Sequence, residues 1–265
     1  MPLALSQLQG FLLDMDGVLY RGDTPVPGMQ ALLEHLEVRS IPHLFLTNNS
    51  SQTPEQYTER LRKMGARVGP ERILTSALVT AAHLAAQASA SSRVLVVGEN
   101  GLRQALLGAG LVLTELYTEA THVVVGLDRE VRYETLALAT LAIRRGAVFL
   151  GTNGDLSLPT ERGLEPGAGT LLAALEAASG VAPQTFGKPE RAMFQTALER
   201  LRTAASRTAM IGDRYETDIQ GAFRAGLVTI AVTSGVHDEA YLRRQSPPPD
   251  FLFPSVAEIQ RALAR

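Results

Sequence analysis

Short apolar runs alternate with amphipathic stretches along the whole chain. The apolar runs predict strands at residues 11–13, 43–46, 94–97, 122–126, 147–150, 209–211 and 228–232. The stretches between them carry apolar residues at helical spacing and predict helices at 29–39, 54–64, 76–87, 132–145, 169–178, 189–202 and 216–225. Strands that alternate with helices in this way indicate an α/β fold, with parallel sheets covered by helices on both faces.

Composition narrows the functional classes. Of the 265 residues, 45% are hydrophobic and 20% charged, which is typical of a globular protein and not of a disordered one. The formal net charge is −2 and basic residues form no long cluster, so a nucleic-acid binder is not expected. The absence of cysteine excludes disulfides, thiol catalysis and thiolate zinc sites. Without a signal-like segment or a long apolar run, we expect a soluble, cytoplasmic protein that does not bind membranes.

Two acidic residues follow the first apolar run, and ligands of open α/β sheets bind beyond the carboxyl ends of the strands. Asp14 and Asp16 are two residues apart and are expected to project to the same side. Carboxylates placed so close together repel unless a cation lies between them or one keeps its proton. A turn that merely ends the strand is the structural alternative.

Three further segments place polar residues at strand ends or helix starts. Thr47 and Asn48 follow the second run and could cradle an anion, or simply cap a helix. Lys188 precedes a predicted helix, where a cation is unfavourable unless an anion lies beside it. Asp213 and Asp218 follow another strand, and their oxygen ligands suit Mg²⁺, although acidic residues also favour a helix start. Each segment alone has a structural explanation, but their combination indicates one site.

Lysine is scarce in this chain. Among 25 basic residues only Lys63 and Lys188 are lysines. A lysine in a chain that otherwise uses arginine indicates a position that requires a compact ammonium. For Lys63, on a predicted helix surface, chance is sufficient explanation.

The motifs Asp14-Met-Asp-Gly, Thr47-Asn-Asn, Gly187-Lys-Pro and Gly212-Asp with Asp218 resemble those of the haloacid dehalogenase superfamily of phosphatases. The tract Gly151-Thr-Asn-Gly-Asp is similar to the NagD-type subgroup, which includes phosphoglycolate and pyridoxal phosphate phosphatases. The resemblance implies a Rossmann-like parallel-sheet core at about 1–81 and 185–265, with an inserted α/β cap at about 82–184. Because relatives often dimerise through the cap, it also implies a homodimer.

The resemblance implies a Mg²⁺-dependent phosphatase that acts on small phosphomonoesters. Asp14 would be the nucleophile and would form an aspartyl-phosphate. Asp14 and Asp213 would ligate Mg²⁺ through carboxylates and Asp16 through its backbone carbonyl. Asp218 would support the metal through a bound water or by orienting the groups that ligate it.

The remaining site residues have implied roles in proton transfer and phosphate binding. Asp16 would protonate the leaving group and then activate the hydrolytic water. Thr47 and the backbone N–H of Asn48 would hold phosphoryl oxygens, and Lys188 would balance the charge of Asp14 and the phosphate. The loop 153–166 would select the substrate, whose identity the sequence does not give.

Two other functions remain open at this point. A phosphomutase or phosphotransferase would use the same core but pass the phosphoryl group to a second substrate, and release of phosphate from one ester alone would argue against it. A regulatory module would keep the phosphoryl group on Asp14 without turnover. The acid–base candidate Asp16 and the cap argue against the regulatory module, because a switch needs neither.

Overall fold

The structure is a computed structural model that describes residues 4–160 and 162–264. It divides into two compact units, which we call unit 1 and unit 2. Unit 1 comprises Met1–Thr47, Glu55–Leu74 and Lys188–Arg265, and unit 2 comprises Asn48–Pro54 and Thr75–Gly187. Position 161, inside the expected substrate-selecting loop 153–166, lies outside the described residues. The boundaries expected from the sequence for a separately folding core and cap stay a prediction.

Unit 1 is built on a sheet whose described strands run in the order β14-β13-β12-β1-β4-β5. Neighbouring pairs from β14 to β4 are parallel, and Leu13 of β1 aligns with Ile211 of β12 and Phe45 of β4. This confirms the α/β class that the alternating pattern predicts. The strands are β1 (Gly10–Asp14), β4 (His43–Thr47), β5 (Ile73–Thr75), β12 (Thr208–Gly212), β13 (Val228–Val232) and β14 (Phe251–Phe253).

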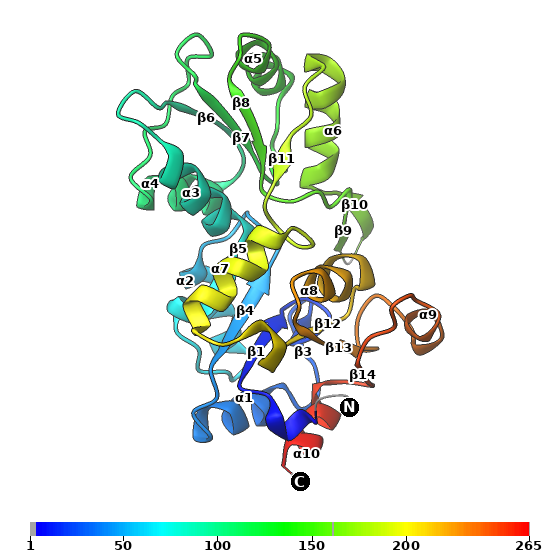
Figure 1. The fold of residues 1–265 in the computed structure, drawn as a ribbon. Coiled ribbons are helices and arrows are strands. Elements are labelled where there is room, and N and C mark those ends of the chain that lie inside the picture. Colours follow the sequence, from blue (N-terminus) through cyan, green and yellow to red (C-terminus); the bar gives the residue numbers. More distant parts are fainter. Residues whose placement is uncertain (1–3, 161, 265) are drawn as a thin grey trace. The chain divides into compact units, whose positions relative to one another are not determined.

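Helices and short turns surround this sheet (Figure 1). A small antiparallel hairpin, β2 (Tyr20–Arg21) with β3 (Thr24–Pro25), follows β1. Short 3₁₀ turns cover Leu5–Gln7, Pro70–Arg72 and Ala205–Arg207, and a π-turn covers Tyr215–Ile219. The helices are α1 (Met29–Val38), α2 (Pro54–Lys63), α7 (Arg191–Leu201), α8 (Gln220–Arg224), α9 (Glu239–Arg243) and α10 (Val256–Leu263).

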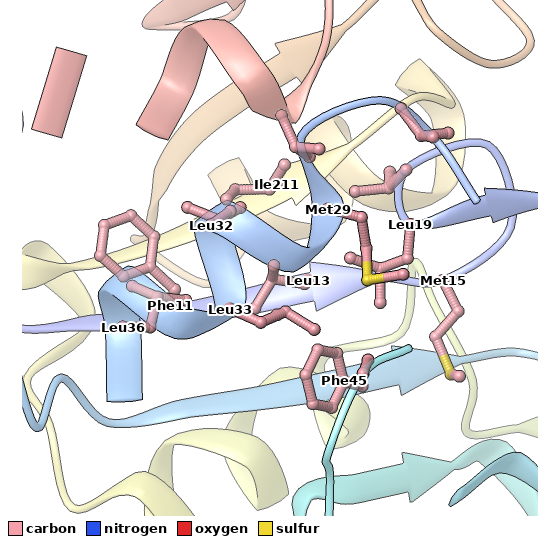
Figure 2. Close-up of a cluster of buried hydrophobic side chains, with 14 of the residues drawn as sticks. Phe11, Leu13, Met15, Leu19, Met29, Leu32, Leu33, Leu36, Phe45 and Ile211 are labelled. Carbon is pink, nitrogen blue, oxygen red and sulfur yellow. The ribbon is translucent and has the colours of Figure 1, made fainter. Parts of the chain in front are cut away.

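The main core of unit 1 lies between one face of the sheet and α1, α2 and α10. Phe11 and Leu13 of β1 point into it, and the intervening Leu12 is buried on the opposite face, as the two-residue period of a strand requires. Leu32 and Leu36 of α1, four residues apart, turn toward this face (Figure 2). Each fully buried leucine contributes about 1.5–3 kcal/mol. This packing holds β1, and therefore Asp14 at its end, in place.

Unit 2 has a smaller parallel sheet of order β11-β8-β7-β6 in the described residues. Its core joins apolar residues of β6, β7 and β8 to α5 and α6. An antiparallel hairpin, β9 (Ser157–Thr160) with β10 (Gly163–Pro166), precedes α6. The sheet strands are β6 (Val94–Val97), β7 (His122–Val125), β8 (Val148–Gly151) and β11 (Gln184–Thr185), and the helices are α3 (Ser76–Gln87), α4 (Asn100–Gly108), α5 (Tyr133–Arg144) and α6 (Ala168–Ser179).

Among the described segments that differ from the sequence-based expectation, two have an identifiable physical cause. Residues 100–108 form helix α4, which is not among the helices predicted from the sequence, because Gly101 and Gly108 lower the helical signal. The helix expected at 216–225 is a π-turn followed by α8, since the Asp218 carboxylate accepts the backbone N–H of Arg214. None of the described helices is both long enough and apolar enough to cross a membrane.

Candidate active site

Three neighbouring strands of unit 1 end in polar residues. Asp14 is the last residue of β1, Thr47 is the last residue of β4, and Asp213 directly follows β12. Because β12, β1 and β4 are adjacent in the sheet and β1 is parallel to both, these three residues meet at one edge. The sheet therefore brings together residues that lie far apart in the sequence.

A cluster of three carboxylates occupies this edge. Asp14, Asp213 and Asp218 each offer an oxygen, and these three atoms lie within 4.8 Å of one another. Asp218 is 1% exposed and Asp213 is 4% exposed, so both are withdrawn from water. Clustered hard oxygen ligands are the kind that a divalent cation such as Mg²⁺ prefers. The group therefore has the chemistry of a metal site.

The ammonium of Lys188 joins the same cluster. Lys188 Nζ contacts Oδ1 of Asp14 and lies 2.7 Å from Oδ1 of Asp218. The lysine is 3% exposed, so the ion pairs are buried. Helix α7 begins only at Arg191, after Lys188, and the anions beside the lysine are these two carboxylates. Its buried position is unlike that of Lys63, which is exposed.

Burial and mutual repulsion shift the acidities of these groups. Desolvation raises the pKa of Asp14 well above its usual range. Attraction to Lys188 opposes this increase only in part, and repulsion from Asp218 and Asp213 adds to it. Desolvation and repulsion from Asp218 raise the pKa of Asp213 to about 6. Burial lowers the pKa of Lys188, but attraction to Asp14 and Asp218 outweighs burial and raises it overall. The lysine is therefore charged. The ionised forms of the carboxylates are disfavoured by burial and by mutual repulsion, and an added cation would offset both effects.

Backbone groups hold the carboxylates of the cluster. Oδ2 of Asp218 accepts the N–H of Arg214 at 3.1 Å, and Oδ2 of Asp213 accepts the N–H of Val236 at 2.7 Å. Gly17 has a φ of +81°, in the left-handed region, and a Cβ there would collide with the Asp213 carboxylate. The position therefore requires glycine both for its backbone conformation and for space.

Asp16 lies beside this cluster in the same unit. It pairs with Tyr20 in an isolated bridge, and the N–H of Gly17 donates to the Tyr20 carbonyl at 2.8 Å. The Asp16 residue is exposed, yet partial desolvation raises the pKa of its carboxyl, with Arg60 and Lys188 acting in the opposite direction. A carboxyl with a raised pKa is suited to donate a proton. Thr47 is buried at the end of β4.

Asn48 belongs to unit 2, where its contacts join it to the loop after β8. Its side-chain amide donates to Asp155 at 3.0 Å, while its carbonyl accepts from Asn153 Nδ2 at 2.7 Å and from Ser76 Oγ at 2.5 Å. The structure thus shows a role for Asn48 in fixing the 153–155 turn. Its expected role as a phosphate-binding backbone group stays a prediction.

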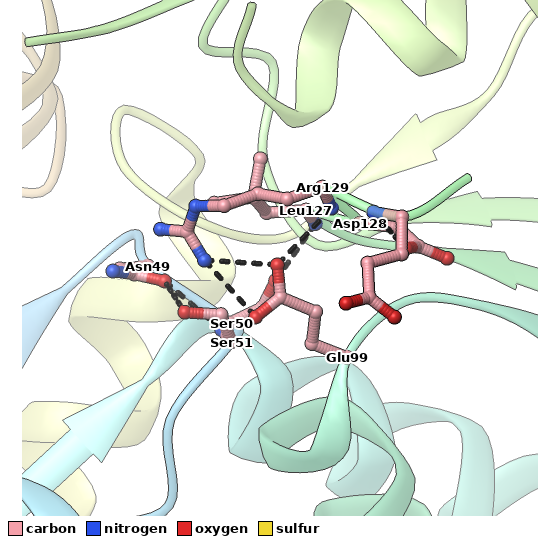
Figure 3. Close-up of polar contacts among 8 residues, drawn as sticks. Asn49, Ser50, Ser51, Glu99, Leu127, Asp128 and Arg129 are labelled. Carbon is pink, nitrogen blue, oxygen red and sulfur yellow. Dashed lines mark hydrogen bonds and ion pairs between the residues drawn. The ribbon is translucent and has the colours of Figure 1, made fainter.

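The residues after Asn48 are anchored in unit 2 as well (Figure 3). Oδ1 of Asn49 accepts from the N–H and hydroxyl of Ser51, and the hydroxyl of Ser50 accepts the N–H of Leu127 at 3.2 Å. Nearby, the guanidinium of Arg129 pairs with both oxygens of Glu99, at 2.8 and 3.0 Å. Each of the three residues that follow Asn48 is thus held by at least one hydrogen bond.

The sequence motifs do not predict several residues that contact the cluster or its neighbours. Val236 and Ser234 lie in the loop after β13, and Ser234 Oγ donates to the Gly17 carbonyl at 2.7 Å. The rule used for the other strand ends would have pointed to this loop too, because β13 is parallel to β12 and adjacent to it. Arg60, which stacks 4.4 Å over the Tyr20 ring, had no comparable signal in the sequence.

Comparison with family models identifies two regions of this chain. Residues 11–112 match a haloacid dehalogenase-like hydrolase family, and residues 185–259 match a family described as HAD-hydrolase-like. An acid sugar phosphatase of Staphylococcus aureus is 42% identical over 254 residues, which cover 96% of this chain and 97% of that protein.

Solved structures show the same similarity. A 4-nitrophenylphosphatase from Thermotoga maritima matches with a TM-score of 0.92 and 33% identity over 98% of both chains. A hypothetical protein from Pyrococcus horikoshii matches with a TM-score of 0.90 and 41% identity, covering 96% of this chain and 99% of that one. The similarity therefore extends over nearly the whole length of the chain.

Proposed function

Since this chain belongs to the haloacid dehalogenase-like hydrolases, as a phosphatase of the NagD type, we propose that Asp14 attacks the phosphorus of a small phosphomonoester in a Mg²⁺-dependent reaction. Its class, a phosphoric monoester hydrolase, follows from these relatives. The metal, the covalent intermediate and the substrate are the parts that we propose. The buried cluster of Asp14, Asp213, Asp218 and Lys188 is the observation that carries the proposal.

The residues present fit a divalent metal ion. Three carboxylates lie within 4.8 Å of one another, and desolvation and repulsion raise the pKa values of Asp14 and Asp213. Asp14 and Asp213 would hold the ion directly, together with the backbone carbonyl of Asp16, and Asp218 would hold it directly or through water. When bound, Mg²⁺ would offset the negative charge shared by the carboxylates and a phosphate and would polarise the phosphoryl group.

Asp14 would act as the nucleophile. Its carboxylate is at the end of β1, fixed by the packing of the sheet and paired with Lys188. Attack would form a bond between an Asp14 oxygen and phosphorus and break the bond from phosphorus to the ester oxygen. Lys188 would remain charged through this step and would stabilise the negative charge on the transferred group.

Asp16 would act as the general acid and then as the general base of the reaction. An alkoxide is a poor leaving group, so Asp16 would donate its proton to the departing ester oxygen. The resulting carboxylate would then take a proton from the attacking water. The water oxygen would bond to phosphorus while the bond from phosphorus to the Asp14 oxygen breaks, which releases phosphate and frees the Asp14 carboxylate. The raised pKa of the Asp16 carboxyl supports the first of these roles, because it keeps the acid form available.

The proposed substrates are small phosphate esters that Thr47 and the backbone of Asn48 would hold by the phosphoryl oxygens. The S. aureus relative is named an acid sugar phosphatase, which makes sugar phosphates the first esters to test on this chain. The loop 153–166 stays the segment that we expect to select the substrate.

The test measures phosphate release from 4-nitrophenyl phosphate and from a panel of sugar phosphates, each as the sole substrate. We expect release that depends on Mg²⁺ and stops in excess EDTA. The Asp14→Asn variant should show no turnover, because an amide is neither a competent nucleophile nor an anionic ligand. Glu59→Gln, at an exposed carboxylate of helix α2 that pairs with Arg62, is the matched control and should retain activity.

Two results would contradict the proposal. Full activity in excess EDTA would remove the metal from it, and full activity of Asp14→Asn would remove the nucleophile. Phosphate release only after addition of a second acceptor would instead favour a phosphotransferase.

A further inference from the structure

The loop between β13 and α9 lies directly against the carboxylate of Asp213. The N–H of Val236 donates to Asp213 Oδ2 at 2.7 Å, and Ser234 Oγ donates to the carbonyl of Gly17 at 2.7 Å. Between them, Gly235 passes so close that a Cβ would collide with the same carboxylate. This loop therefore sets the direction in which Asp213 presents its other oxygen.

The C-terminal end of this loop is held by the carboxylate of Glu216. His237 Nε2 lies 2.9 Å from Glu216 Oε2, and the hydroxyl of Tyr241 donates to Glu216 Oε1 at 2.5 Å. The His237 and Tyr241 rings stack with centroids 4.0 Å apart and an interplanar angle of 15°. Glu216 thus binds the residue next to Val236 and the first turns of α9 at the same time.

Glu216 itself comes from the π-turn that carries Asp218. The turn Tyr215–Ile219 starts two residues after Asp213 and places Asp218 in the carboxylate cluster. The segment 213–219 supplies Asp213 and Asp218 to the cluster. The contacts of Glu216 with His237 and Tyr241 therefore connect this segment to the loop that orients Asp213. None of the three side chains belongs to the cluster itself.

We propose that Glu216 is a positioning residue for the metal site, and that it acts through His237 and Tyr241 to hold the Val236 N–H on Asp213. The inference rests on the proposed function, since it concerns the metal that Asp213 would bind. Residues that orient metal ligands from outside commonly change metal affinity about 10- to 100-fold when replaced. Glu216 acts one contact further from the ligand, so we expect an effect near tenfold.

A purely structural role predicts something different. An exposed ion pair contributes little to folding, and Glu216 is half exposed, so the loss of a mere surface pair would leave the cluster unchanged. The positioning role predicts instead weaker Mg²⁺ binding with little change in kcat once Mg²⁺ is saturating. The two roles are therefore separated by metal affinity and not by stability.

The experiment is Mg²⁺ titration of the full-length protein by calorimetry without substrate, with Mg²⁺ activation of 4-nitrophenyl phosphate hydrolysis measured in parallel. Glu216→Ala should weaken Mg²⁺ binding about tenfold. Glu216→Gln, which keeps an oxygen acceptor and adds a donor, should bind more nearly like the wild type. Tyr241→Phe keeps the ring and loses one contact to Glu216, so a smaller change of about threefold is expected.

The matched control is Arg243→Ala. It removes an exposed ion pair with Glu239 on the same helix α9, 2.7 Å in length, that does not involve the loop. Mg²⁺ affinity should remain at the wild-type value in this variant.

The outcomes separate the inference from the proposed function. If the wild type binds no Mg²⁺ and has no Mg²⁺-dependent activity, the proposed function fails. If the wild type binds Mg²⁺ and Glu216→Ala binds it equally well, only the positioning role fails. Equal losses in Glu216→Ala and Arg243→Ala would also overturn it, because the effect would then belong to α9 in general.

Discussion

Lys188 Nζ lies 2.7 Å from Asp218 Oδ1, and this buried ion pair joins residues from the segments that precede α7 and follow β12. The same ammonium contacts Asp14 at the end of β1. One compact cation therefore links three separate segments of unit 1. The scarcity of lysine elsewhere in the chain agrees with a position that an arginine would not fill in the same way.

Replacement of Lys188 by arginine tests this geometry. The longer, planar guanidinium does not fit between two carboxylates in a site that is 3% exposed, so we expect kcat/KM to fall about 100-fold or more. Lys63→Arg, at an exposed position, is the matched control and should be unchanged. Steady-state kinetics with 4-nitrophenyl phosphate measure both variants, and near-wild-type activity of Lys188→Arg would show that the site does not need a compact cation.

Asp16→Asn should lower kcat by an amount that depends on the leaving group of the ester. Alkyl phosphates need protonation of the departing oxygen, so their hydrolysis should fall about 1000-fold. Aryl phosphates release a stable phenolate and should lose about tenfold or less. The measurement is kcat for a sugar phosphate against kcat for 4-nitrophenyl phosphate in both proteins. An equal loss on both esters would mean that Asp16 supports the structure of the site and transfers no proton.

Mg²⁺ should stabilise the folded protein. Binding to the native state alone adds about 2.7 kcal/mol at a free concentration one hundred times Kd. Asp213→Asn should lose most of this gain, whereas Asp23→Asn, whose side chain is 93% exposed, should keep it. The test is the increase in Tm on addition of Mg²⁺, followed by differential scanning fluorimetry. The same increase in Asp213→Asn as in the wild type would place the ion elsewhere.

The pH dependence of stability follows from the raised pKa of Asp213. This pKa is about 6 in the folded protein against an ordinary value of 3.8, so between these values the folded state holds a proton that the unfolded state has lost. The contribution of Asp213 to stability without metal should therefore fall as pH rises from about 4 to 6, and then level off. Asp213→Asn cannot titrate and should lack this contribution.

The measurement is the free energy of unfolding in urea at several pH values with EDTA present, taken as the difference between wild type and Asp213→Asn. The wild type should lose stability relative to the variant as pH rises through this window. A difference that does not change with pH would contradict the assigned acidity of Asp213.

Much of the fold is encoded locally. The apolar runs at 11–13, 43–46, 209–211 and 228–232 predict β1, β4, β12 and β13, whose bounds in the structure extend them by at most one residue at either end. Strands buried on both faces need continuous apolar sequence, which makes this signal strong. Because the strands are parallel, Asp14, Thr47 and Asp213 could also be placed at one edge of a sheet in advance.

Other elements depend on contacts that no local pattern contains. Helix α4 includes Gly101, a poor helix former, because the backbone of Gln52 passes where a Cβ would lie and the Gly101 N–H donates to the Ser51 carbonyl. Helix propensity is weak beside such packing. The π-turn at Tyr215–Ile219 likewise depends on the Asp218 side chain that accepts the Arg214 N–H.

For the site, the sequence by itself determined which residue types stand at the strand ends, and the tertiary structure decided which of them meet. Lys188 is 174 residues from Asp14 in the chain, yet folding places its ammonium on the Asp14 carboxylate. Val236 lies outside the motifs, and Glu216 lies between Asp213 and Asp218 with no role implied for it there. The importance that we propose for both residues comes from the loop that packs on Asp213. The physical reason is that a strand end is set by nearby apolar residues, whereas the direction of a buried carboxylate is set by the groups that surround it in space.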